Sequence, residues 1–182
     1  MRGSVGRFGV ERRLHHRLPN IRIALEAVKA ASQPHHFLSV TKGGHSAIVS
    51  TSGNEDCHII LRGGRTPNYD RASVEAACRE AGAAALACRL MIDCSHGNSQ
   101  KNPDNQLLVA QDICDQLSDG ESRIFGVMLE SHLVAGREDL IAGRSPTYGR
   151  SITDGCLGWE ATEQALELLV EGVSQRRIAM SQ

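Results

Sequence analysis

The chain has 182 residues, which is enough for one domain or a large part of one. Its formal net charge of −1 provides no positive field, so we expect neither nucleic acid nor a membrane as a partner. No apolar run is long enough to span a bilayer and no secretory signal is evident, which favours a cytoplasmic protein. The six cysteines form no CxxC pair, so we expect most of them to be reduced and buried.

The first nineteen residues differ in composition from the rest of the chain. They contain five arginines against a single acid, Glu11, and show no sustained helical or strand period. An organellar transit peptide, a disordered tail and a segment foreign to the fold all fit this composition. We therefore predict a boundary at residue 20, with 1–19 as a disordered tail and 20–182 as the folded part.

The folded part opens with a helix and a hairpin. IRIALEAVKAA carries apolar residues at helical spacing, and Pro34 ends the pattern. Two short strand-like runs follow, 36–41 and 46–51, and a glycine pair separates them. This arrangement predicts a β-hairpin.

Strand-like and helix-like segments then alternate. Continuous apolar runs at 57–64, 89–99 and 123–131 each end in polar residues, as strands buried on both faces do. Helical patterns at 71–86, behind the capping residue Asp70, and at 104–118 separate them.

A polar stretch, a short fourth strand at 151–154 and a long amphipathic helix close the chain. This alternation indicates βα units on a parallel sheet. Arg62, His96 and Glu130 follow one another at equal intervals of 34 residues. Eight units in about 250 residues is typical of a (β/α)₈ TIM barrel. An open doubly wound sheet is the alternative, although no GxGxxG follows the first strand.

Four chemically capable side chains stand at the carboxyl ends of these strands: Arg62, His96, Glu130 and Asp154. In a parallel barrel these ends converge on the face where active sites are built. His, Glu and Asp together suit one divalent cation such as Mn²⁺, Fe²⁺, Co²⁺ or Zn²⁺. Arginine followed by two glycines suits a phosphate or a carboxylate.

Each of these residues also has an ordinary structural interpretation. His96 would then be a satisfied core histidine, Glu130 an ion-pair partner, and Asp154 the cap of the final helix. Three such coincidences at aligned strand ends are less plausible than one shared site. Asp93 and Ser95 flank His96 and could orient it. Cys94 could reach a metal, but a small core residue is its more ordinary role.

Longer motifs carry a family resemblance. HFLSVTKGGHSAIVSTSGNEDCHIILRGG, MIDCSHGNSQK, GVMLESHL and YGRSITDGCLGWE resemble class I 3-deoxy-7-phosphoheptulonate (DAHP) synthase from about residue 20 to residue 177. The resemblance implies the C-terminal part of a TIM barrel decorated by the hairpin. It also implies an enzyme of the shikimate pathway to aromatic amino acids.

The resemblance assigns roles to single residues. His96, Glu130 and Asp154 match the positions that bind the divalent metal, and Arg62 matches the arginine that contacts the phosphate of phosphoenolpyruvate. The implied reaction condenses phosphoenolpyruvate with erythrose 4-phosphate and releases phosphate.

The hairpin matches the part of the family that binds a feedback inhibitor. Ser39 and Val49 match positions that line the phenylalanine pocket in phenylalanine-sensitive members, so an aromatic amino acid is the expected inhibitor. The family forms dimers or tetramers, so we expect a homo-oligomer.

Several motifs of the family have no counterpart in the chain. A CSIHD-like segment with a cysteine ligand, a KPRT-like loop and a GARTTES-like segment are all missing. RRLHHRLP stands where the family has an FKNGTDG-like stretch with a substrate lysine. We therefore expect an incomplete barrel, with a frameshift or a wrongly assigned start upstream. The alternative function is a catalytically inactive fragment that binds only metal or an oxyanion.

Overall fold

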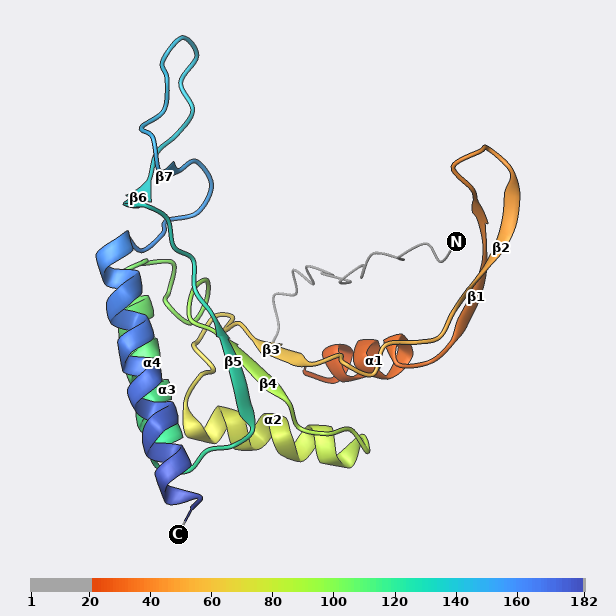
Figure 1. The fold of residues 1–182 in the computed structure, drawn as a ribbon, viewed down its shortest axis with the longest axis horizontal. Coiled ribbons are helices and arrows are strands. Elements are labelled where there is room, and N and C mark those ends of the chain that lie inside the picture. The colour runs from red at the N-terminus through yellow and green to blue at the C-terminus, as the bar shows by residue number, and fades with distance from the viewer. Residues whose placement is uncertain (1–20, 182) are drawn as a thin grey trace.

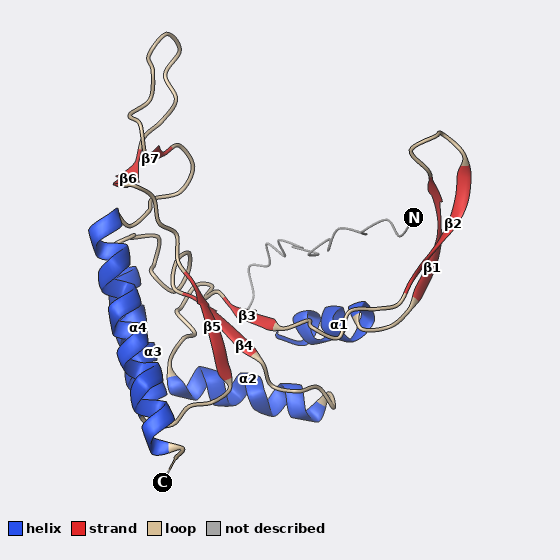
Figure 2. Cartoon of the chain, in the orientation of Figure 1, coloured by secondary structure: helices blue, strands red, loops and turns tan. Residues whose placement is uncertain are grey.

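The computed structural model describes residues 21–181, so the predicted tail at 1–19 lies outside the described residues. The described chain forms four helices and seven strands, arranged as an α/β layer with two outlying β elements (Figures 1 and 2). The helices are α1 (Ile21–Ala31), α2 (Arg71–Ala83), α3 (Asn105–Ser118) and α4 (Trp159–Ala179). The strands are β1 (His35–Val40), β2 (Ser46–Thr51), β3 (Ile59–Leu61), β4 (Leu90–Asp93), β5 (Ile124–Met128), β6 (Val134–Arg137) and β7 (Arg150–Ser151).

A parallel sheet of three strands forms the centre of the layer. Its order is β3-β4-β5, and α2 and α3 connect successive strands. The predicted βα alternation is therefore confirmed over this stretch. Among the described residues the sheet has two free edges, so this part of the chain does not close a barrel.

The core lies where the helices cover this sheet. Leu90 and Ile92 on β4 are fully buried, as are Val74 on α2 and Ile113 on α3. One apolar cluster joins these residues to buried side chains of α1, β3 and β5. The polar strand ends project beyond this core, so a rigid base supports them.

Local signals explain where the helices begin and how they pack. Asp70 caps α2 as predicted, because its side chain accepts a hydrogen bond from the Ser73 N–H at 3.0 Å. Helices α3 and α4 run side by side (Figure 1). A Cβ at Gly172 would lie 2.9 Å from the backbone of Cys114, so glycine allows this close approach.

The fourth strand differs from its prediction. The strand is only Arg150–Ser151, and it pairs in parallel with β6, which the sequence did not reveal. Asp154 therefore lies in a bend after the strand. The cap of α4 is Gly158, so Asp154 does not cap the final helix.

The predicted hairpin is confirmed as the antiparallel pair β1–β2, which stands beyond α1 at the opposite end of the molecule from α4 (Figure 1). Ser39 pairs with Ala47 and Phe37 with Val49. Because opposed residues and second neighbours share a face, Ser39 and Val49 lie on the same side of the hairpin.

Cys78 and Cys88 form a disulfide, while the other four cysteines are free and three of these are buried. Within residues 21–181, no helix has the length and apolar character that crossing a bilayer requires.

Candidate metal centre

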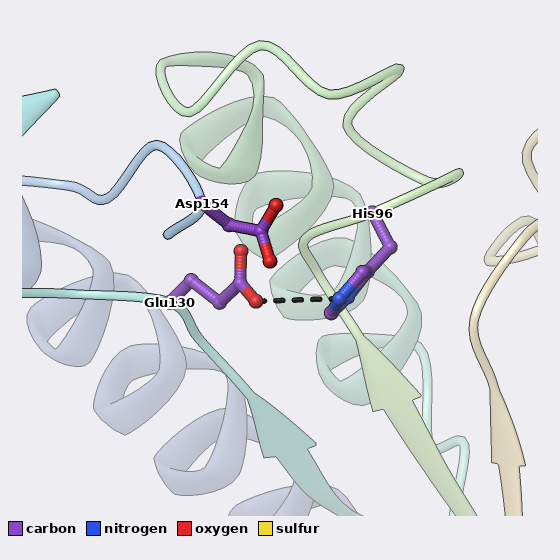
Figure 3. A group of neighbouring side chains, drawn as sticks. All are labelled: His96, Glu130 and Asp154. Atoms are coloured by element: carbon purple, nitrogen blue, oxygen red, sulfur yellow. Dashed lines mark ion pairs between the residues drawn. The ribbon is translucent and has the colours of Figure 1, made fainter. Parts of the chain in front are cut away.

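Three of the four predicted site residues come together at the carboxyl edge of the sheet. His96 follows β4, Glu130 follows β5 and Asp154 follows β7. Each offers one ligand atom, and these atoms all lie within 4.8 Å of one another. Figure 3 shows the imidazole ring and the two carboxylates facing a common point. His96 Nε2 lies 3.3 Å from Glu130 Oε1.

The spacing of this group fits a cation. Ligand atoms about 2.1 Å from one ion stand roughly 3–4 Å apart, so only a small closing movement would be needed. The donors are one imidazole nitrogen and two carboxylate oxygens, a set that divalent transition metals accept. The group is partly open to solvent, because Asp154 is exposed and the other two are half-buried.

His96 is held by its neighbours on the chain. Its backbone has φ of 51°, which turns the ring out of the strand direction. The ring Nδ1 donates to Asp93 Oδ2 at 2.8 Å and also lies 2.7 Å from Ser95 Oγ. A proton on Nδ1 leaves the lone pair on Nε2, the atom that faces Glu130.

Asp93 also links this histidine to the predicted phosphate-binding arginine. Arg62 Nε lies 3.8 Å from Asp93 Oδ2, with the Asp93 side chain almost fully buried. The same carboxylate accepts hydrogen bonds from the N–H and hydroxyl of Ser95. Asp93 thus connects the ends of β3 and β4 through one buried negative charge.

Asn98 joins the same two strand ends through the backbone. Its Nδ2 donates to the carbonyls of Leu61 at 3.1 Å and Asp93 at 2.8 Å. Its Oδ1 accepts from the Asn68 N–H at 2.8 Å, which ties down the loop after Arg62.

Two glycines allow the loops after β3 and β4 to touch. A Cβ on Gly63 would lie 2.5 Å from backbone atoms of Gly97 and Asn98, and a Cβ on Gly97 would meet Gly63. Gly63 also has φ of 70°, a conformation that glycine adopts without strain. The glycine after Arg62 therefore serves close backbone packing.

The charges around the group favour a bound cation. Burial raises the pKa of the Glu130 carboxyl, and the carboxylates of Asp154 and Asp93 raise it further, although His96 and Arg62 act in the opposite direction. Carboxylates that repel one another are those that a divalent cation stabilises.

Cys94 faces a different environment. Its side chain is fully buried, and this burial together with the charge of Asp93 raises the pKa of its thiol to about 12. A metal-binding cysteine needs the thiolate form, so Cys94 fits the core role. Strand β4 ends at Asp93, so the alternation that would align Cys94 with His96 does not continue.

Gln106 and Asn98 are polar residues at this site that the sequence analysis missed. Gln106 occupies the apolar stripe of α3 one turn before Val109 and Ala110, and it is completely buried. A polar glutamine on the otherwise apolar face of a helix was the sequence feature that could have revealed this role, because buried polar groups are hydrogen-bonded. Asn98 gave no comparable signal, because a polar residue after a strand end is common.

The two predicted inhibitor-binding residues lie apart from this centre. Ser39 is half-buried on β1 and Val49 is 37% exposed on β2. The hairpin that carries them stands away from the sheet edge (Figure 1).

The chain is similar to known proteins over most of its length. Residues 16–167 match the model of the DAHP synthetase I family. The chain is 54% identical over 162 residues to a phospho-2-dehydro-3-deoxyheptonate aldolase of Haemophilus influenzae, covering 88% of this chain and 45% of that protein. It is 52% identical over 157 residues to the Phe-sensitive enzyme of that name from Escherichia coli, covering 86% and 45%.

A solved structure gives the same result for the fold. The chain superposes on the phospho-2-dehydro-3-deoxyheptonate aldolase of Francisella tularensis with a TM-score of 0.80 and 47% identity, over 86% of this chain and 46% of that one. The chain therefore spans slightly less than half the length of each of these three relatives.

Proposed function

The chain belongs to the DAHP synthetase I family, and we propose that it carries part of the active site of a 3-deoxy-7-phosphoheptulonate synthase. The proposed reaction condenses phosphoenolpyruvate with erythrose 4-phosphate and releases phosphate. We also propose that residues 20–182 form the C-terminal part of a TIM barrel. The observation that carries the proposal is the convergence of His96, Glu130 and Asp154 within 4.8 Å.

In this proposal the three side chains hold one divalent cation, one of Mn²⁺, Fe²⁺, Co²⁺ or Zn²⁺. When bound, the cation would serve as a Lewis acid for the aldehyde of erythrose 4-phosphate. Asp93 keeps the proton of His96 on Nδ1, so that Nε2 is available as a ligand. Glu130 must lose its proton to bind, so cation affinity falls as the pH is lowered.

Arg62 is the proposed binding residue for the phosphate of phosphoenolpyruvate. Its guanidinium is partly exposed at the end of β3, and Asp93 holds it on the side of His96. A guanidinium binds phosphate oxygens in bidentate fashion and stabilises charge that develops on the leaving phosphate.

A metal titration tests the cation site. Mn²⁺ added to the purified chain should bind with 1:1 stoichiometry, measured by calorimetry. His96→Ala should abolish this binding, since one of three ligands is lost, while Cys94→Ala should leave it unchanged. Loss of binding in the Cys94 variant alone would contradict the assignment.

The phosphate site has its own matched pair of variants. Arg62→Gln should weaken phosphoenolpyruvate binding while Mn²⁺ binding persists. Arg65→Gln removes an exposed arginine from the same loop and should change neither affinity. Equal effects of the two substitutions would show that general charge, and not a specific contact, attracts the ligand.

The second candidate function is binding without catalysis. The chain covers 45% of the length of its Haemophilus influenzae relative. The motifs that would supply a cysteine ligand and further substrate contacts are missing from its 182 residues. Loss of one electrostatic contact can reduce a rate by ~10²–10³-fold. We therefore expect the 182 residues alone to bind cation and phosphoenolpyruvate but to release no phosphate from the substrate pair. Rapid phosphate release would contradict this.

For the hairpin we propose an aromatic amino acid as ligand, with Ser39 and Val49 in its site and phenylalanine as the preferred one. Support comes from their shared face on β1–β2 and from the Phe-sensitive relative. Phenylalanine, tyrosine and tryptophan should be compared by their effect on the methyl NMR signals of Val49. A response to tyrosine alone would overturn the preference.

A further inference from the structure

Both hydrogen-bonding atoms of the Gln106 side chain are used on the backbone of Glu130. Gln106 Nε2 donates to the Glu130 carbonyl at 3.0 Å, and the Glu130 N–H donates to Gln106 Oε1 at 2.9 Å. The glutamine side chain is completely buried in the first turn of α3. A buried amide with both groups paired in this way has one defined orientation.

This contact acts where the regular strand has ended. Strand β5 stops at Met128, two residues before Glu130. Beyond that point the Glu130 carbonyl also accepts from the Leu157 N–H at 2.9 Å, while its own N–H is taken by Gln106. The Glu130 peptide is therefore fixed by two partners: the segment at Leu157, which bridges to Ser131, and the side chain of Gln106, which is the partner of the Glu130 N–H.

The location of the Glu130 backbone decides where its carboxylate can reach. To share one ion, the carboxylate oxygen of Glu130 must stay close to the ligand atoms of His96 and Asp154, which lie within 4.8 Å of one another and of it. Without an ion, the carboxylates of Glu130 and Asp154 repel each other at this separation. An uncharged clamp on the backbone holds the carboxylate in place without adding to the repulsion.

We propose that Gln106 is a positioning residue of the cation site, holding the Glu130 carboxylate at its place through the paired hydrogen bonds to the Glu130 backbone. The inference rests on the cation site of the proposed function. Residues that orient metal ligands typically contribute 10–100-fold to metal affinity.

The same helix provides a matched control. Gln116 is also buried on α3, and its Nε2 donates to the Tyr69 carbonyl at 2.8 Å and to Asp112 at 2.6 Å. None of these partners belongs to the cation site. Gln106→Met and Gln116→Met each replace a buried amide by an apolar side chain of similar length, so both should lower stability.

The first measurement is the Mn²⁺ affinity of the folded variants. Gln106→Met should weaken binding about 10-fold or more, and Gln116→Met should remain within about twofold of the unmodified chain. Unchanged affinity in Gln106→Met would make Gln106 an ordinary core residue and overturn the inference.

The second measurement is hydrogen exchange of the Glu130 amide in the metal-free chain. Exchange should accelerate in Gln106→Met but not in Gln116→Met. If the unmodified chain binds no Mn²⁺, the proposed cation site is wrong. The exchange rate of the Glu130 amide then tests by itself whether Gln106 holds the Glu130 backbone. Equal exchange at Glu130 in both methionine variants would then overturn the inference.

Discussion

The three-stranded sheet and the hairpin β1–β2 are both built from apolar strands, yet they bury those strands very differently. Ile92 on β4 is fully buried, whereas Leu38 and Ile48 on the hairpin are 79% and 72% exposed. The sheet is covered by α2 and α3, whereas none of the helices within residues 21–181 covers the hairpin (Figure 2). Apolar residues favour a strand in both places, but burial depends on what packs against it.

This difference in burial matches the proposed roles of the residues in the two regions, cation ligands at the sheet and inhibitor-binding residues on the hairpin. The proposed cation ligands follow strands anchored in the core, where small displacements are resisted. The proposed inhibitor residues Ser39 and Val49 lie on a two-stranded element that draws little stability from its own packing. The sheet therefore suits fixed geometry, and the hairpin suits a surface that a ligand or another chain completes.

The largest expected effect contrasts one core residue with one hairpin residue. Ile92→Ala should lower the free energy of unfolding by about 2–5 kcal/mol, because it leaves a cavity in the centre of the core. At protein concentrations below self-association, Leu38→Ala should change it by less than about 0.5 kcal/mol, because the side chain is exposed in the single chain. Urea denaturation measures both values. Comparable losses would mean that the hairpin packs on another surface in solution.

A second prediction concerns the base of the sheet. The side chain of Arg123 donates to the buried Glu121 carboxylate at 2.8 Å, and this hydrogen bond lowers the pKa of Glu121. The folded pKa lies below the unfolded value, so the contribution is present above about pH 4.3 and is lost as the pH falls through the folded pKa.

Glu121→Gln should therefore cost about 1.5–3 kcal/mol at pH 7 and less at pH 3. Urea denaturation at both pH values measures the difference. Glu55→Gln on an exposed loop is the control and should show no comparable loss at either pH. A cost for Glu121→Gln that grows on acidification would contradict the assigned direction.

The smallest expected effect tests association through the hairpin. Leu38, Val40 and Ile48 form an exposed apolar face on β1–β2, and such a face favours contact with another copy of the chain. Leu38→Lys should raise the dissociation constant of the self-associated species about tenfold, since roughly one leucine contact is lost. Sedimentation velocity measures this. A monomeric parent chain with a cooperative melt would count against association and against an incomplete barrel.

Much of the fold followed from local patterns. The helix before Pro34, the hairpin, the three parallel strands and the Asp70 cap were all predicted, because each depends on residues close together in sequence. The convergence of His96 and Glu130 also followed, since parallel strands place their carboxyl ends at one edge. The strand predicted at 151–154 was wrong beyond Ser151, because two residues carry too weak a pattern.

The sequence by itself determined which elements form and which side chains stand at their ends. An orienting role of Asp93 on His96 was also within reach of the sequence, because the two residues are close together in the chain. The tertiary structure alone decided the longer-range contacts that hold those ends: Asn98 across two strand ends and Gln106 on the Glu130 backbone. It also decided the disulfide between Cys78 and Cys88. The physical reason is that periodicity records burial and local conformation, whereas a hydrogen-bond partner across 24 residues exists only once the core has brought α3 against the end of β5.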